Sequence, residues 1–228
     1  MDFLTTAIFI LKGTGYTVAL VIGALALGFL IGLPLACLRL YGPPIVSRLV
    51  AVYVWFFRGV PILVLLFLVY FGFYSVIEKF LLNRFDWRIS FSPFSASLVA
   101  LGLASAAYQS QIFRGAIQSL HLGQFKAALA LGFSKTRAIF HIIIPQALRL
   151  SLPAWSNEYS ILLKDSAIAY VLGTMEIMSR TKAMAAFTYK HISFYVLAGV
   201  IYYILTFLGV RLLRYCEKRT HIPGLGTE

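Results

Sequence analysis

Charged residues are scarce in this chain. Asp, Glu, Lys and Arg make up 12% of its 228 residues, whereas average soluble domains contain about 25%. Hydrophobic residues make up 60%, and the mean hydropathy is +0.85. This composition excludes an ordinary soluble domain and predicts an integral membrane protein.

Acidic residues are scarcer than basic ones. The chain has 8 Asp and Glu against 20 Lys and Arg, which gives a formal net charge of +12. A strongly basic chain can indicate a nucleic-acid partner. Here, however, the basic residues are dispersed at the ends of apolar segments, where they meet lipid headgroups. We therefore expect membrane lipid, and no nucleic acid, as a partner.

Residues that support covalent or metal chemistry are also few. Cys37 and Cys216 are far apart, so we expect neither a disulfide framework nor a metal site. The sequence has no Gly-x-x-x-x-Gly-Lys-Ser/Thr loop for a nucleotide. We expect no catalytic residue, no metal and no bound cofactor. The histidines are scattered without the spacing of a metal or general-base site, at His121, His141, His191 and His221.

Long apolar runs between charged residues predict an all-α integral membrane protein with about five transmembrane helices. A helix needs about 20 apolar residues to cross a bilayer. We expect the whole chain, 1–228, to form one transmembrane domain without a cleavable signal peptide. In the first run, Gly28 and Gly32 have the small-xxx-small spacing that lets helices approach closely. The expected spans are about 14–38, 46–77, 91–113, 137–163 and 192–210.

The second and fourth spans carry ionisable side chains to membrane depth. Arg58-Gly59-Val60-Pro61 interrupts the second span, and Gly59 and Pro61 should loosen the helix there. An arginine at the bilayer centre costs about 2.5–3.5 kcal/mol on insertion scales, so Arg58 needs a partner or water. The alternative is that Arg58 extends to the membrane interface.

Glu158 is the one carboxylate that these boundaries place inside a span. Such a carboxylate is a functional candidate by default, so we expect Glu158, with Asn157 beside it and Arg58, to contact a substrate. The alternative is structural: Glu158 pairs with Arg58 or Arg149 and joins two helices. In the third span we expect interhelical hydrogen bonds, with ligand contact as the alternative, from the polar side chains Ser105, Tyr108, Gln109, Ser110 and Gln111.

A polar segment of about 121–135 separates the third and fourth spans. Lys126-Ala-Ala-Leu-Ala-Leu-Gly132 begins with helix formers, and Gly132 stands where a helix would end in a left-handed cap. Ser134 stands where the next helix would be N-capped. The small side chains of Ala127, Ala128 and Ala130 suit a helix that fits a groove on a partner.

This segment resembles the EAA loop of the membrane-spanning subunits of bacterial ABC importers. The resemblance rests on the alanine pair, Gly132 and the Ile-x-Ile-Pro145 end. The flanking segments 57–61, 145–149 and 157–158 are similar to the polar amino acid permeases of that superfamily, and the resemblance covers roughly residues 10 to 215. Lys126 departs from the pattern, because the family usually has Glu there.

The resemblance implies a permease subunit that forms the path for polar amino acids across the bacterial inner membrane. It implies three partners: an ATPase subunit that binds ATP, an extracytoplasmic solute-binding protein, and a second permease subunit, identical or homologous. It places the loop in the cytoplasm, the N-terminus outside and the C-terminus inside. The implied coupling residues are Lys126, Ala127, Ala128 and Gly132.

Two other classes remain open from the residues alone. A self-contained channel or secondary transporter would more often show internal repeats, and we find none. An integral membrane enzyme is less favoured because no nucleophile or metal constellation is present in the sequence.

Overall fold

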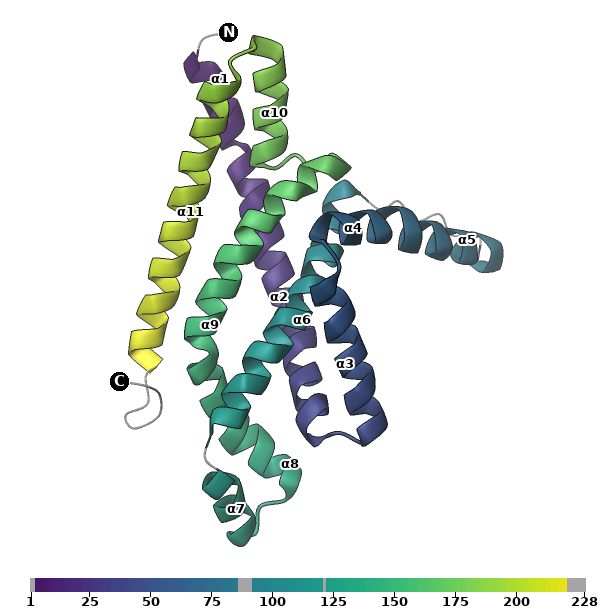
Figure 1. The fold of residues 1–228 in the computed structure, drawn as a ribbon, viewed down its shortest axis with the longest axis vertical. Helices are drawn as coiled ribbons and strands as arrows, with labels where there is room; N and C mark the ends of the chain where they lie inside the picture. Colours follow the sequence, from purple (N-terminus) through teal and green to yellow (C-terminus); the bar gives the residue numbers. More distant parts are fainter. Residues whose placement is uncertain (1–2, 86–91, 121, 221–228) are drawn as a thin grey trace.

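The structure is a computed structural model that describes residues 3–85, 92–120 and 122–220. In these residues every regular element is a helix (Figure 1). The predicted all-α class is confirmed. Residue 91, where the third span was predicted to begin, and residue 121, the predicted start of the loop, lie outside the described residues. The elements are α1 Phe3–Leu11, α2 Gly13–Tyr41, α3 Pro44–Gly59, α4 Ile62–Phe67, η1 Leu68–Phe73, α5 Tyr74–Phe85, α6 Pro93–Ser119, α7 Leu122–Ala130, α8 Lys135–Ala138, η2 Ile139–Ile143, α9 Ile144–Asp165, η3 Ser166–Leu172, α10 Ile177–Thr188 and α11 His191–Thr220.

Helices α2, α6 and α9 form the centre of the molecule. Helix α6 packs along α2 and against α9, while α3 covers α2 and α6 and α11 covers α9 (Figure 1). The main apolar core joins the three central helices through Leu20 and Val21 of α2, Leu101 of α6, and Leu162 and Leu163 of α9. Removing such side chains from contact with lipid or water lets them pack at the density of a protein interior.

The α2–α6 contact depends on two glycines. A Cβ atom added at Gly32 would lie 2.9 Å from the carbonyl oxygen of Ala106, and one added at Gly28 would lie 2.4 Å from Gln109 Nε2. The close helix approach predicted from the Gly28–Gly32 spacing is therefore confirmed, and α6 is the partner helix.

Two helical stretches among the described residues are long and apolar enough to cross a membrane unaided. They are Leu4–Tyr41, with 38 residues, and His191–Thr220, with 30. Pro44–Gly59 and Ile62–Phe73 qualify together as a third, although their axes differ by 109°. Helices α6 and α9 have 27 and 22 residues, and their polar side chains lower the mean hydropathy.

The bend between α3 and α4 follows from local chemistry. Val60 is extended, with φ −87° and ψ 131°, because the residue before a proline avoids the helical region. Pro61 then begins a new helix and lacks the N–H that would continue the old one. The loosened helix predicted at Gly59 and Pro61 is confirmed as a sharp bend. After it, α4 and η1 pack against α6, and α5 projects from the body (Figure 1).

We predict that Gly32→Ala lowers the melting temperature of the purified protein. The added methyl group must displace backbone of α6, and such overpacking costs about 1–3 kcal/mol. Gly15→Ala is the matched control, because a Cβ at Gly15 has no heavy atom within 4 Å. Differential scanning fluorimetry of both variants measures the effect; equal melting temperatures would show that α2 and α6 can separate freely.

Candidate functional site: a charged cavity at the bent helix

The α3–α4 bend, α6 and α9 enclose a cavity of about 300 Å³. Its walls combine a cation, two carboxyl groups, an aromatic ring and the non-helical backbone of the bend. A larger space of about 680 Å³ lies between α2, α9 and α11, but its walls are apolar and suit hydrocarbon. The residues that line the charged cavity are Arg58, Gly59, Val60, Pro61, Ile62, Ala104, Ser105, Tyr108, Glu158, Ile161, Leu162 and Asp165.

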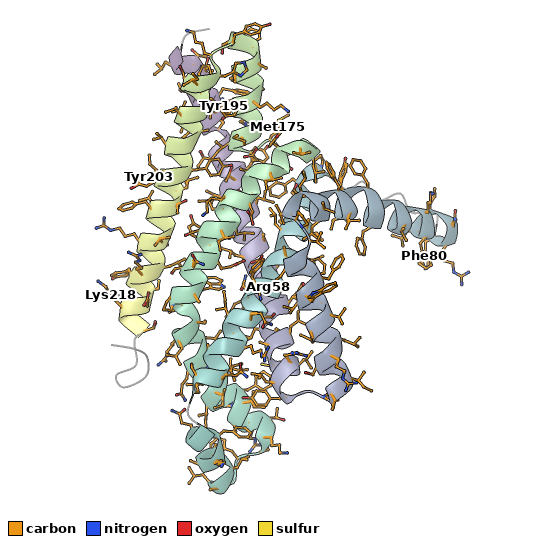
Figure 2. All side chains as sticks on the ribbon, viewed as in Figure 1. Arg58, Phe80, Met175, Tyr195, Tyr203 and Lys218 are labelled. Atoms are coloured by element: carbon orange, nitrogen blue, oxygen red, sulfur yellow. The ribbon has the colours of Figure 1, made fainter. Side chains whose placement is uncertain are left out.

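Arg58 lies in the last turn of α3, just before the bend, and Figure 2 labels it in the middle of the molecule. Its guanidinium carbon is 5.0 Å from the centre of the Tyr108 ring on α6. This is cation–π geometry, in which the guanidinium meets the negative face of the ring. The guanidinium nitrogens therefore keep their capacity to bind a carboxylate in the cavity.

Glu158 lies on α9 and is 3% exposed. The Ser105 hydroxyl donates a hydrogen bond to Glu158 Oε1 at 2.6 Å. No ion pair between Glu158 and an arginine occurs among the described residues. Arg149 lies nine residues earlier on the same helix, about 14 Å along its axis. The ion pair with Arg58 or Arg149 that the structural alternative requires is therefore not formed in this conformation.

The structure brings together two of the three predicted substrate-contacting residues. Arg58 and Glu158 line the same cavity, whereas Asn157 does not line it and its side chain is exposed. Neighbouring helical residues point about 100° apart, so Asn157 faces away when Glu158 faces inward.

Tyr108 and Asp165 also line the cavity, and sequence reasoning did not assign them to it. Helical spacing offered a signal for both. Tyr108 is three residues after Ser105, and Asp165 is seven after Glu158, so each shares a helix face with a cavity residue. Asp165 was excluded because the predicted span ended at residue 163.

The predicted interhelical role of the third-span polar residues is confirmed for Ser105 and Gln109. Ser105 on α6 bonds Glu158 on α9, and Gln109 bonds both the Leu25 carbonyl of α2 and the Trp155 indole of α9. Tyr108 instead contributes its ring to the cavity.

The loop between α6 and α9 has the helix–turn–helix form that its sequence predicts. Helix α7 ends in a Schellman motif: Phe133 N–H donates to Ala128 O at 3.1 Å, and Gly132 N–H donates to Leu129 O at 3.0 Å. Gly132 has a φ of +85°. Ser134 then caps α8 by accepting a hydrogen bond from Arg137 N–H.

The loop folds back on the chain, because α7 packs against η2 and α8. Ala128 is consequently only 2% exposed and is not available to a partner in this conformation. Lys126 and Ala127 are exposed, and Leu131 is 79% exposed. Any docking face on the loop therefore comprises the side of α7 away from Ala128.

We predict that Gly132→Ala speeds amide hydrogen exchange at the end of α7. A left-handed conformation costs a residue with a Cβ about 1–2 kcal/mol, which corresponds to about 5- to 30-fold faster exchange. Gly123→Ala, in the same helix, is the control, since neither position has a neighbour within 4 Å and only Gly132 has a positive φ. Unchanged exchange at positions 132 and 133, measured by mass spectrometry, would contradict the left-handed turn assigned to Gly132.

The fold is a helical membrane domain, and ionisable groups at a bent helix inside such a domain mark a functional site. Residues 24–222 match the family described as binding-protein-dependent transport system inner membrane component. The chain belongs to this family of permeases.

Named relatives agree with this assignment over nearly the whole chain. It is 36% identical to the nopaline transport system permease protein NocM of Agrobacterium fabrum, covering 88% of this chain and 83% of the relative. It is 33% identical to the L-cystine transport system permease protein TcyL of Bacillus subtilis, covering 96% of this chain and 88% of the relative.

Solved structures show the same fold. A crystal structure of an amino acid ABC transporter with histidines matches with a TM-score of 0.79 and 32% identity, covering 96% of this chain and 99% of that one. The MetNI methionine ABC transporter, in an inward-facing conformation, matches in fold with a TM-score of 0.70 at 20% identity.

Proposed function

We propose that this permease forms the path for polar amino acids through an ATP-driven importer of the bacterial inner membrane. The carrying observation is the cavity in which Arg58 and Glu158 face one space without pairing with each other. An α-amino acid has a carboxylate and an ammonium group. The guanidinium of Arg58 suits the carboxylate, and the carboxylate of Glu158 suits the ammonium.

The relatives support an amino acid as the solute. Nopaline and L-cystine, named for two relatives, and the histidines of the solved transporter all carry amino and carboxyl groups. Asp165 gives the cavity a second carboxyl group, which offers a place for a positive side chain.

The proposed topology has five spans, formed by α1 with α2, by α3, by α6, by η2 with α9, and by α11. Helix α3 has 16 residues and is about 24 Å long, which approaches the thickness of the bilayer core. Helix α7, the α2–α3 turn and the end of α11 lie at one end of the molecule, opposite α1 and α10 (Figure 1). The cytoplasmic side of this topology carries ten Lys and Arg residues near span ends, including Arg39, Arg48, Arg211 and Arg214. The other side carries eight, including Lys12, Arg180, Lys182 and Lys190. The positive-inside rule therefore favours the first end as cytoplasmic and the N-terminus as external by a small margin.

The proposed partners follow from the family, and the orientation assigns each of them to one end of the molecule. The α7–α8 loop would meet a separate ATPase subunit, which binds the ATP, while this chain holds no cofactor of its own. The opposite end would receive an extracytoplasmic solute-binding protein, and a second permease subunit, identical or homologous, would complete the path. Lys126 is exposed and carries an ammonium where the family usually has a carboxylate, so we propose that the ATPase groove compensates with a residue that is not basic there.

Replacement of Glu158 by Gln tests the function. Reconstituted with its ATPase and solute-binding protein, the Glu158→Gln permease should raise the KM for amino acid uptake about 10- to 100-fold, because a charge-assisted hydrogen bond contributes about 1.5–3 kcal/mol. The measurement is uptake of radiolabelled L-histidine, L-arginine and L-glutamine into proteoliposomes. Glu217→Gln, which removes a carboxylate near the end of α11, is the control. Wild-type kinetics in Glu158→Gln would contradict the proposed site.

Replacement of Ala127 by Trp tests the docking loop. Ala127 is exposed, so the indole should block ATPase association without lowering the melting temperature of the permease. Co-purification of the tagged permease with its ATPase measures association. Met175→Trp is the control, since Met175 is 57% exposed and lies far from α7 (Figure 2). Normal co-purification of Ala127→Trp would exclude this face as the docking surface.

A further inference from the structure

Gln109 is the most deeply buried amide in the centre of the molecule, with 0% exposure. It contacts all three central helices. Its Nε2 donates to the Leu25 carbonyl of α2 at 3.0 Å and to Ser105 Oγ of α6 at 3.1 Å. Its Oε1 accepts from the Trp155 indole N–H of α9 at 2.8 Å.

These partners fix the orientation of the amide. An indole N–H only donates and a backbone carbonyl only accepts. Trp155 therefore requires the amide oxygen, and the Leu25 carbonyl requires the amide nitrogen. The second N–H of the amide then points to Ser105 Oγ.

Gln109 restricts where the Ser105 proton can point. The Gln109 N–H occupies one side of the Ser105 oxygen, so the hydroxyl proton points elsewhere, and the structure places it on Glu158 Oε1, at 2.6 Å. Glu158 Oε2 has no hydrogen-bond partner among the described residues, although the carboxyl group lines the cavity. One carboxylate oxygen is thus held by the helix packing and the other is left for a solute.

Ser105 differs in this respect from most serines in the helices. A helical serine commonly donates to a carbonyl three or four residues earlier, and Ser105 has such a carbonyl available at Leu101. The serines that do so are Ser95, Ser97, Ser110, Ser119, Ser151, Ser156, Ser160 and Ser166. Two features distinguish Ser105 from them: the Glu158 carboxylate lies within reach of its hydroxyl, and the Gln109 amide donates to its oxygen.

We propose that Gln109 is a positioning residue for solute binding: it directs the Ser105 hydroxyl onto Glu158, which holds the carboxylate with one oxygen toward the cavity. This inference rests on the proposed function of Glu158. It also ties the site to the α2–α6 contact, because the Gln109 amide reaches Leu25 through the space that Gly28 leaves open.

The test replaces Gln109 by Met, which keeps the length of the side chain and removes both donors. The assay uses the complete importer in proteoliposomes and whichever of L-histidine, L-arginine and L-glutamine the wild type accumulates fastest. The KM for uptake should rise about tenfold, while kcat per assembled transporter stays within about twofold. Ser105→Ala should give the same rise in KM, and Ser105→Thr, which keeps the hydroxyl, should restore most of it. Gln118→Met is the control, because Gln118 is exposed on the same helix.

A double-mutant cycle then asks whether Gln109 acts through Glu158. In the Glu158→Gln background, Gln109→Met should change the KM for the same amino acid less than twofold. Equal effects in both backgrounds would overturn the proposal. A merely structural role predicts a lower melting temperature and less assembled transporter, with KM unchanged.

Infrared spectroscopy separates failure of this inference from failure of the proposed function. The carboxyl band of Glu158 is the band lost in Glu158→Gln, and Gln109→Met should shift it, because the band responds to the Ser105 hydrogen bond. An unmoved band would overturn the positioning role whatever the transport data. A shifted band with wild-type uptake in Glu158→Gln would instead overturn the function assigned to Glu158, and with it the role of Gln109 in solute binding.

Discussion

The close approach of α2 to α6 is the constraint on which the rest of this structure depends. In hydrocarbon a polar side chain has no water, so its partners must come from the protein. Gly28 and Gly32 bring the two helices near enough for the Gln109 amide to reach a backbone carbonyl of α2. That amide in turn satisfies Ser105 and Trp155, and Ser105 satisfies Glu158. The buried Glu158 carboxylate is tolerated on α9 because Gly28 of α2 leaves room for the Gln109 amide, which holds the Ser105 hydroxyl that Glu158 accepts from.

Features that depend on a few neighbouring residues were predictable from the sequence. The turn at Gly132 and the cap at Ser134 follow from backbone preferences that act within one helical turn. The bend after Arg58 follows from Pro61, and the α2–α6 contact follows from two glycines on one helix face. In each case the residue type alone restricts the conformations that the chain can adopt.

Features that depend on which helix faces which were not predictable in the same way. Asn157 and Glu158 are adjacent and both polar, and only packing against α6 determines that Glu158 alone lines the cavity. Ala128 is buried because α7 folds back on η2, a contact between segments that hydropathy does not connect. Asp165 was excluded by a boundary drawn on hydropathy, although α9 continues to it without interruption.

The separation of Arg58 from Glu158 explains how one small cavity can suit a zwitterion. A direct ion pair would neutralise both groups, and a solute would have to break it before binding. The structure instead gives each group a neutral partner: the Tyr108 ring lies against the guanidinium, and the Ser105 hydroxyl lies against the carboxylate. Neither partner cancels the charge it contacts. Opposite charges are thus held in one space by different helices, Arg58 by the end of α3 and Glu158 by α9. The bend at Pro61 is therefore part of the proposed site, because it ends α3 directly after Arg58 and leaves the Arg58 guanidinium at the cavity.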